Sequence, residues 1–219
     1  MLKPSKLFSE SDLIRIKATV EEAEGMTSGE IVPYVVDMSD TYEVAEWRAG
    51  VLCGVMALGT FTAVRQFTEV WLPLDFVEMA LVAMFASAAG ALLTHFVSPL
   101  QRLFAGKHLM DLRVHQRAMQ AFIAEEVFAT RDRTGILIFL SLLEHKVRVL
   151  ADSGINAKVQ QSDWDGVAQL IVSGIRNGKA ADGFVGAIRE CGRLLEAHGF
   201  PKRVDDKDEL SDNLRVGKR

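Results

Sequence analysis

The chain has 219 residues, which is enough for one domain with an insertion or for two small domains. Its 29 aspartates and glutamates outnumber 25 lysines and arginines, so the net charge is −4, and we expect no nucleic-acid partner because such proteins carry a basic stripe. The two cysteines, Cys53 and Cys191, form no zinc pattern and argue against a disulfide framework.

The first expected elements are a helix and a strand. Ser9, with Asp12 three residues later, resembles a capping box, and apolar residues then recur at helical spacing until Gly25. The next segment, SGEIVPYVVD (28–37), is typical of a strand. Because Pro33 has no N–H to donate to a ladder, we expect this strand to lie at a sheet edge or to carry a bulge.

Two long apolar segments follow, at about 48–66 and 76–98. A spanning helix needs about 17 to 25 apolar residues. The second segment meets this length, because residues 79–100 carry no charge other than that of a protonated histidine. The first is shorter, but its flanking Arg48 and Arg65 have side chains long enough to reach the membrane interface.

We interpret residues 48–102 as a transmembrane helical hairpin; the alternative is a buried helical hairpin of a soluble protein. The connecting loop, QFTEVWLPLDFVE, holds three acidic residues and no lysine or arginine beyond Arg65, which precedes it. Basic residues flank the hairpin on its outer sides: Arg48, Arg102, Lys107 and Arg113. The positive-inside rule then places both termini in the cytoplasm. We expect a two-span protein of the bacterial inner membrane, whose partners are the lipid bilayer and other membrane proteins.

The stretch RTGILIFLSLLEHKVRVLADSGI, residues 133–155, predicts a buried β-hairpin. Its apolar run over 135–143 is too short to cross a membrane as a helix and fits a strand that is covered on both faces. Residues 144–146 form the turn, and a returning strand with alternating residues ends at Asp152.

Three further helices are expected at about 108–128, 163–177 and 182–198, from apolar residues at helical spacing. The tail at 200–219 is polar, and we expect it to be extended or loose.

The predicted element order is helix, strand, apolar hairpin, helix, two strands and two helices. This order favours an α/β (α+β) sandwich, in which helices flank a small central β-sheet and the transmembrane hairpin interrupts the domain. Residues 1–47 and 103–219 would then form one discontinuous soluble domain.

Three segments of the chain resemble the TPM-domain family: TSGEIVPYVV, RTGILIFLSLLEHKVRVLADSGI and IRNGKAADGFVGAIRECGRLL. The apolar hairpin after the first strand and the tail FPKRVDDKDELSDN are similar to a bacterial membrane-anchored branch of that family. The family includes a thylakoid-lumen acid phosphatase and a photosystem II repair protein. The resemblance implies a central sheet flanked by helices, divalent-cation binding, weak phosphatase activity, and roles in the assembly or maintenance of membrane complexes.

Three carboxylates are candidate metal ligands. Asp37 follows the first strand, Asp152 follows the returning strand of the β-hairpin, and Asp182 lies between the last two helices. Ligands of α/β sheets gather at the carboxyl ends of strands, and Ca²⁺ or Mg²⁺ prefers oxygen ligands. The alternative is structural: Asp152 begins a turn and Asp182 caps its helix.

The sequence contains no Ser/His/Asp order, GxSxG motif or phosphate loop. We therefore expect a membrane-anchored TPM-like domain that acts as a binding or assembly module in the maintenance of membrane complexes, with a dependence on Ca²⁺ or Mg²⁺. The alternative is a weak, metal-assisted phosphatase in which Asp152 and Asp182 hold the ion.

Overall fold

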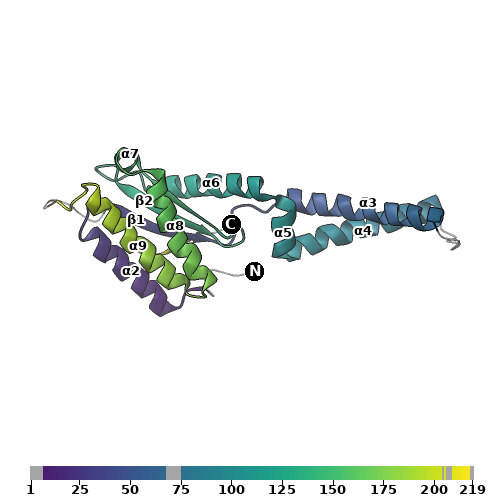
Figure 1. Ribbon diagram of the computed structural model, residues 1–219, viewed down its shortest axis with the longest axis horizontal. Coiled ribbons are helices and arrows are strands. Elements are labelled where there is room, and N and C mark those ends of the chain that lie inside the picture. The colour runs from purple at the N-terminus through teal and green to yellow at the C-terminus, as the bar shows by residue number, and fades with distance from the viewer. Residues whose placement is uncertain (1–6, 68–74, 204, 206–208, 218–219) are drawn as a thin grey trace. The chain divides into compact units, whose positions relative to one another are not determined.

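The computed structural model of the protein describes residues 7–67, 75–203, 205 and 209–217 (Figure 1). The chain forms two compact units. The first combines residues 1–39 with 112–219 and is called the sheet unit here. The second, residues 40–111, is called the hairpin unit.

The sheet unit contains a four-stranded sheet in the order β3-β2-β1-β4. Strand β1 (Glu30–Val36) pairs in parallel with β2 (Gly135–Ser141). Strand β2 turns into the antiparallel β3 (Lys146–Ala151), which confirms the predicted β-hairpin. Strand β4 (Arg215–Gly217) pairs in parallel with the end of β1.

Helices cover both faces of this sheet, and all residues of β1 and β2 are therefore buried. Helices α2 (Glu10–Glu24), α8 (Gln161–Arg176) and α9 (Ala180–Ala197) supply the core on one face. Helix α6 (Lys107–Ala124) supplies the core on the other. The predicted fold class, an α/β sandwich with a central sheet flanked by helices, is confirmed.

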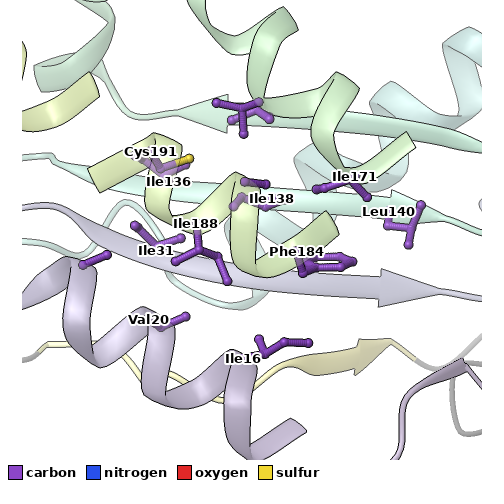
Figure 2. Close-up of a cluster of buried hydrophobic side chains, with 14 of the residues drawn as sticks. Ile16, Val20, Ile31, Ile136, Ile138, Leu140, Ile171, Phe184, Ile188 and Cys191 are labelled. Atoms are coloured by element: carbon purple, nitrogen blue, oxygen red, sulfur yellow. The ribbon is translucent and has the colours of Figure 1, made fainter. Parts of the chain in front are cut away.

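The larger core cluster follows the alternation of the strands. Ile136, Ile138 and Leu140 lie two residues apart on β2 and share one face, because successive side chains of a strand point to opposite faces. Figure 2 shows the side chains that pack against them from the helices and from β1: Ile16, Val20, Ile31, Ile171, Phe184, Ile188 and Cys191. Burial raises the pKa of the Cys191 thiol, so this cysteine is a neutral core residue.

Helix α2 begins at the predicted capping box. The Ser9 hydroxyl accepts a hydrogen bond from the N–H of Asp12 at 3.2 Å, and the Asp12 carboxylate accepts one from the N–H of Ser9 at 3.0 Å. These two bonds satisfy N–H groups that have no partner within the helix.

Among the described residues, Pro33 of β1 has a strand neighbour on one side only. It stands opposite Ile138 of β2, while β4 pairs with β1 from Tyr34 onward. The expectation that this strand lies at a sheet edge is therefore wrong, because β1 lies between β2 and β4. The proline is accommodated before the start of the β4 pairing, where its missing N–H costs no ladder hydrogen bond to β4.

The tail was expected to be extended or loose, and its described residues Arg215–Gly217 are extended, as strand β4. Besides the pairing of β4, the carboxylate of Glu30 accepts hydrogen bonds from the N–H groups of Glu209 and Leu210, both at 3.3 Å. The Glu209 carboxylate in turn accepts from the N–H of Arg131 at 2.9 Å. The tail is ordered by contacts with residues far away in the chain, which its polar composition does not reveal.

The hairpin unit consists of α3 (Glu43–Phe67), α4 (Phe76–Phe96) and the short α5 (Ser98–Ala105), which was not predicted. Helices α3 and α4 are long and apolar enough to cross a membrane, judged by length and composition alone. Most of the loop between them lies outside the described residues.

Small residues set the distance between α3 and α4. A Cβ atom added at Gly90 would lie 2.5 Å from Sγ of Cys53, and one added at Gly50 would lie 3.0 Å from the backbone oxygen of Ser87. Such close approach of backbones is typical of helix pairs that pack in lipid.

Candidate functional site

Asp37 lies just beyond the carboxyl end of β1. Its backbone oxygen accepts a hydrogen bond from the N–H of Leu143 at 2.8 Å, which ties the end of β1 to the β2–β3 turn. Its Oδ1 atom is buried and accepts no hydrogen bond from the described residues.

Asp152 lies at the opposite end of the sheet. Its N–H donates to the backbone oxygen of Gly135 at 2.9 Å, at the start of β2. Its Oδ1 accepts from the N–H of Ser153 at 2.6 Å, and its Oδ2 lies 2.9 Å from Nε of Arg133. The side chain is only 5% exposed, so the guanidinium offsets the cost of burying this carboxylate. Asp152 was expected, as the structural alternative, to begin a turn; it instead caps the short helix α7 (Ser153–Asn156).

Asp182 lies in the first turn of α9 and is exposed. The residue that caps α9 is Lys179, so the expectation that Asp182 caps the helix is wrong. Asp182 instead forms an exposed ion pair with Arg15 of α2.

The three candidate carboxylates do not converge on one point. Because β3 runs antiparallel to β2, its carboxyl end returns to the start of β2, whereas Asp37 follows β1 at the other end of the sheet. Among the described residues, no group of three or more histidines, cysteines, aspartates or glutamates is placed to hold a metal ion. Asp37, Asp152 and Asp182 therefore do not fit a shared Ca²⁺ or Mg²⁺ site.

A buried polar network lies at the Asp37 end of the sheet and was not predicted from the sequence. Oε1 of Glu144 accepts from the N–H of Ser39 at 2.8 Å, and its Oε2 accepts from the hydroxyl of Ser141. The two serine hydroxyls are 2.9 Å apart. Glu144 is only 5% exposed although it belongs to the β2–β3 turn. The network fastens this turn to the segment that follows β1.

The Asp152 end of the sheet carries several exposed ion pairs. Asp205 from the tail pairs with Arg131 at 2.7 Å, and the guanidinium of Arg131 lowers the pKa of the Asp205 carboxyl. Arg203 pairs with Asp132. A cavity of about 250 Å³ lies beside these groups and is lined by Ser28, Asp132, Thr134, Gly154, Gly199, Phe200, Pro201 and Arg203.

The ion pairs around this cavity place charged side chains at the surface, where they could contact a ligand or a partner protein. Asp132, Asp152 and Asp205 are each paired with a guanidinium group. The cavity lining contains no histidine or cysteine that would serve as a base or nucleophile. The geometry suits a binding surface whose charges are held in fixed positions.

Residues 106–194 match the sequence model of the TPM domain. No curated protein matches the chain. The chain is also similar to a solved structure, the NMR structure of BA42 protein from the psychrophilic bacterium Bizionia argentinensis. The TM-score is 0.59 and the identity 19%, with 99% of this chain and 100% of that chain covered. At this identity the likeness shows the fold, and the family match confirms the resemblance predicted from the sequence.

Proposed function

Because residues 106–194 form a TPM domain, we propose that the protein is a membrane-anchored binding module that serves the assembly or maintenance of membrane complexes. The anchor is the helical hairpin of α3 and α4, and the module is the sheet unit.

One observation carries the proposed anchor: the apolar surface of the hairpin unit is uncovered. Val55 on α3 is 61% exposed and Phe85 on α4 is 68% exposed, and many of their neighbours are equally uncovered. An apolar patch of this extent is unusual on a soluble monomer. In a bilayer it needs no cover, because lipid tails are as apolar as the side chains and each helix satisfies its own backbone groups.

The charges at the two ends of the hairpin support an orientation. Arg48, Arg102 and Lys107 lie at the end where the hairpin joins the rest of the chain, and Asp75 and Glu78 form the capping box that begins α4 at the loop end. The three basic residues outnumber Arg65, the basic residue in the last turn of α3 at the loop end. Lysines and arginines are in excess on the cytoplasmic side, so the sheet unit faces the cytoplasm of a bacterial cell and the hairpin lies in the inner membrane.

A groove on the hairpin supports contact with lipid or with other membrane proteins. It measures about 450 Å³, and its lining is Glu46, Trp47, Gly50, Val51, Ser87, Ala88 and Ala91. The small residues among them, Gly50, Ser87, Ala88 and Ala91, permit an acyl chain or a partner helix to approach the backbone closely.

Binding is favoured over hydrolysis as the role of the sheet unit. Asp152 and Asp182, the residues expected to hold an ion in a phosphatase, are each paired with an arginine and lie on different elements. Ca²⁺ or Mg²⁺ dependence stays a prediction, as does weak phosphatase activity, and neither gains support from these positions.

The anchor is tested by washing membranes that contain the full chain with alkaline carbonate. We expect the protein to stay in the membrane pellet. The double variant Leu81→Lys and Phe85→Lys places charges on the exposed face of α4 and should release it, because each charge in the bilayer core costs about 3 kcal/mol.

The matched control is Ile14→Lys with Met119→Lys, which charges two apolar side chains exposed on the sheet unit. These changes should leave the protein in the pellet. Release of the unaltered protein by carbonate would contradict the anchor.

The alternative function is tested on the detergent-purified chain with an aryl phosphate and Mg²⁺. The proposal predicts no turnover above background. Turnover that is lost in Asp152→Asn would favour the phosphatase instead.

A further inference from the structure

We propose that a cavity at the turn end of the β2–β3 hairpin binds a small apolar carboxylic acid of about the size of a methylbenzoate. The cavity lies in the sheet unit and measures about 140 Å³. The β2–β3 hairpin, the last turns of α8 and a residue that precedes α2 line it. The lining residues are Leu7, Leu140, Ser141, Leu142, His145, Val147, Val172, Ile175 and Arg176. The proposal goes beyond the membrane role and does not depend on it.

The walls of this cavity select an apolar body. Val147 on β3 and Val172 with Ile175 on α8 present aliphatic side chains to it. The cavity is about as large as the engineered apolar cavities that stay dry and take up a benzene ring. A single ring or a short branched chain therefore fits, and its transfer from water to these walls is favourable.

The rim of the cavity selects a negative charge. Arg176 in the last turn of α8 is exposed and carries the only permanent charge among the lining residues, and His145 lines the cavity from the turn. The lining contains no carboxylate. A guanidinium beside an apolar cavity matches a carboxylate attached to an apolar group.

Glu144 is the acidic residue nearest in sequence to this lining, and it does not itself line the cavity. Its carboxylate accepts hydrogen bonds from the N–H of Ser39 and the hydroxyl of Ser141. These bonds hold Glu144 within the network that fastens the turn to the end of β1.

Calorimetric titration of the detergent-purified full chain with 4-methylbenzoate tests the proposal, with 4-methylbenzyl alcohol as a neutral ligand of similar shape. We expect saturable binding of the acid, with the alcohol bound more weakly. Arg176→Gln should weaken binding of the acid about fivefold and leave the alcohol unchanged, because a solvent-exposed charge contact contributes about 1 kcal/mol or less. Arg189→Gln, which removes an exposed arginine of α9 outside the cavity, should change neither affinity.

Val172→Phe fills the cavity and should abolish binding of both ligands. Val147→Phe fills it from β3, and either variant is informative if its melting temperature stays close to that of the unaltered protein. The proposal is overturned if the acid does not bind saturably, if binding survives in a folded cavity-filling variant, or if acid and alcohol bind equally and neither responds to Arg176→Gln.

Discussion

Arg133 and Asp152 form an ion pair, with Nε 2.9 Å from Oδ2, between the segment that precedes β2 and the turn that follows β3. The arginine is 52% exposed and the aspartate 5% exposed, so the pair lies between the interior and the surface of the sheet unit. The same carboxylate caps α7 through Ser153. Asp152 therefore closes the β-hairpin at the end opposite its turn.

We predict that Asp152→Asn lowers the free energy of unfolding by about 1 kcal/mol, because the amide keeps a cap for Ser153 but loses the charge beside Arg133. Asp152→Ala should cost about 1 kcal/mol more, since the cap is lost as well. Denaturant unfolding measures both changes. Glu22→Gln, which removes the exposed pair with Arg189, is the control and should have little effect. A loss in Asp152→Asn that occurs only when Ca²⁺ or Mg²⁺ is present would contradict this structural role.

Gly135 is predicted to be intolerant of any side chain. A Cβ atom there would lie 1.9 Å from the backbone oxygen of Val127, and a backbone atom cannot turn away as a side chain can. Gly135→Ala should cost about 3 kcal/mol or more of unfolding free energy. Gly166→Ala is the matched control: its Cβ meets no atom within 4 Å in the interior of α8, so it should stabilise the protein by about 0.5–1 kcal/mol. Equal melting temperatures for the two variants would refute the predicted clash at Gly135.

The capping box of α2 predicts a pH dependence. The hydroxyl and N–H of Ser9 hold the pKa of Asp12 below its ordinary value of 3.8. A carboxyl whose pKa is lowered on folding stabilises the protein above its unfolded pKa, and this contribution is lost as the pH falls through the folded pKa. Asp12→Asn should therefore be less stable than the unaltered protein at pH 7, and the difference should shrink in acid. A difference that is independent of pH would rule out the charge as its origin.

The buried carboxylate of Glu30 is predicted to hold the tail on the sheet unit. Glu30→Ala removes the acceptor of the Glu209 and Leu210 N–H groups, so hydrogen exchange at these two amides should become faster. Glu126→Ala, a nearby exposed acid outside this contact, should leave both exchange rates unchanged. Unchanged exchange in Glu30→Ala would mean that other contacts hold the tail.

Local signals carried most of the fold prediction. The capping box at Ser9 and Asp12, the apolar run of β2 and the apolar helices of the hairpin each depend on residues close in sequence, and each lies where the sequence indicates. The short helices α5 and α7 and the strand β4 were missed, because a few residues do not establish a period.

The candidate site was harder to predict because it depends on strand direction and long-range contact. Because β3 runs antiparallel to β2, Asp152 returns to the start of β2, away from Asp37, and this reversal separates the two carboxylates. The bond between Ser39 and Glu144 joins residues 105 positions apart, and no pattern near either of them marks it. Likewise, nothing in the local sequence indicates that Arg133 is the partner of Asp152.

The central claim, a sheet unit anchored on the cytoplasmic side of a membrane by the α3–α4 hairpin, is tested most directly by labelling single introduced cysteines in intact cells with a membrane-impermeant maleimide. The native Cys191 is buried and Cys53 is partly buried, and the unaltered protein gives the background. Asp75→Cys at the loop end of α4 should be labelled from outside, whereas Lys179→Cys on the sheet unit should be labelled only after the cells are broken. Labelling of Lys179→Cys in intact cells, with Asp75→Cys protected, would contradict the proposed orientation. If neither site is labelled after the cells are broken, the exposure of both positions is contradicted.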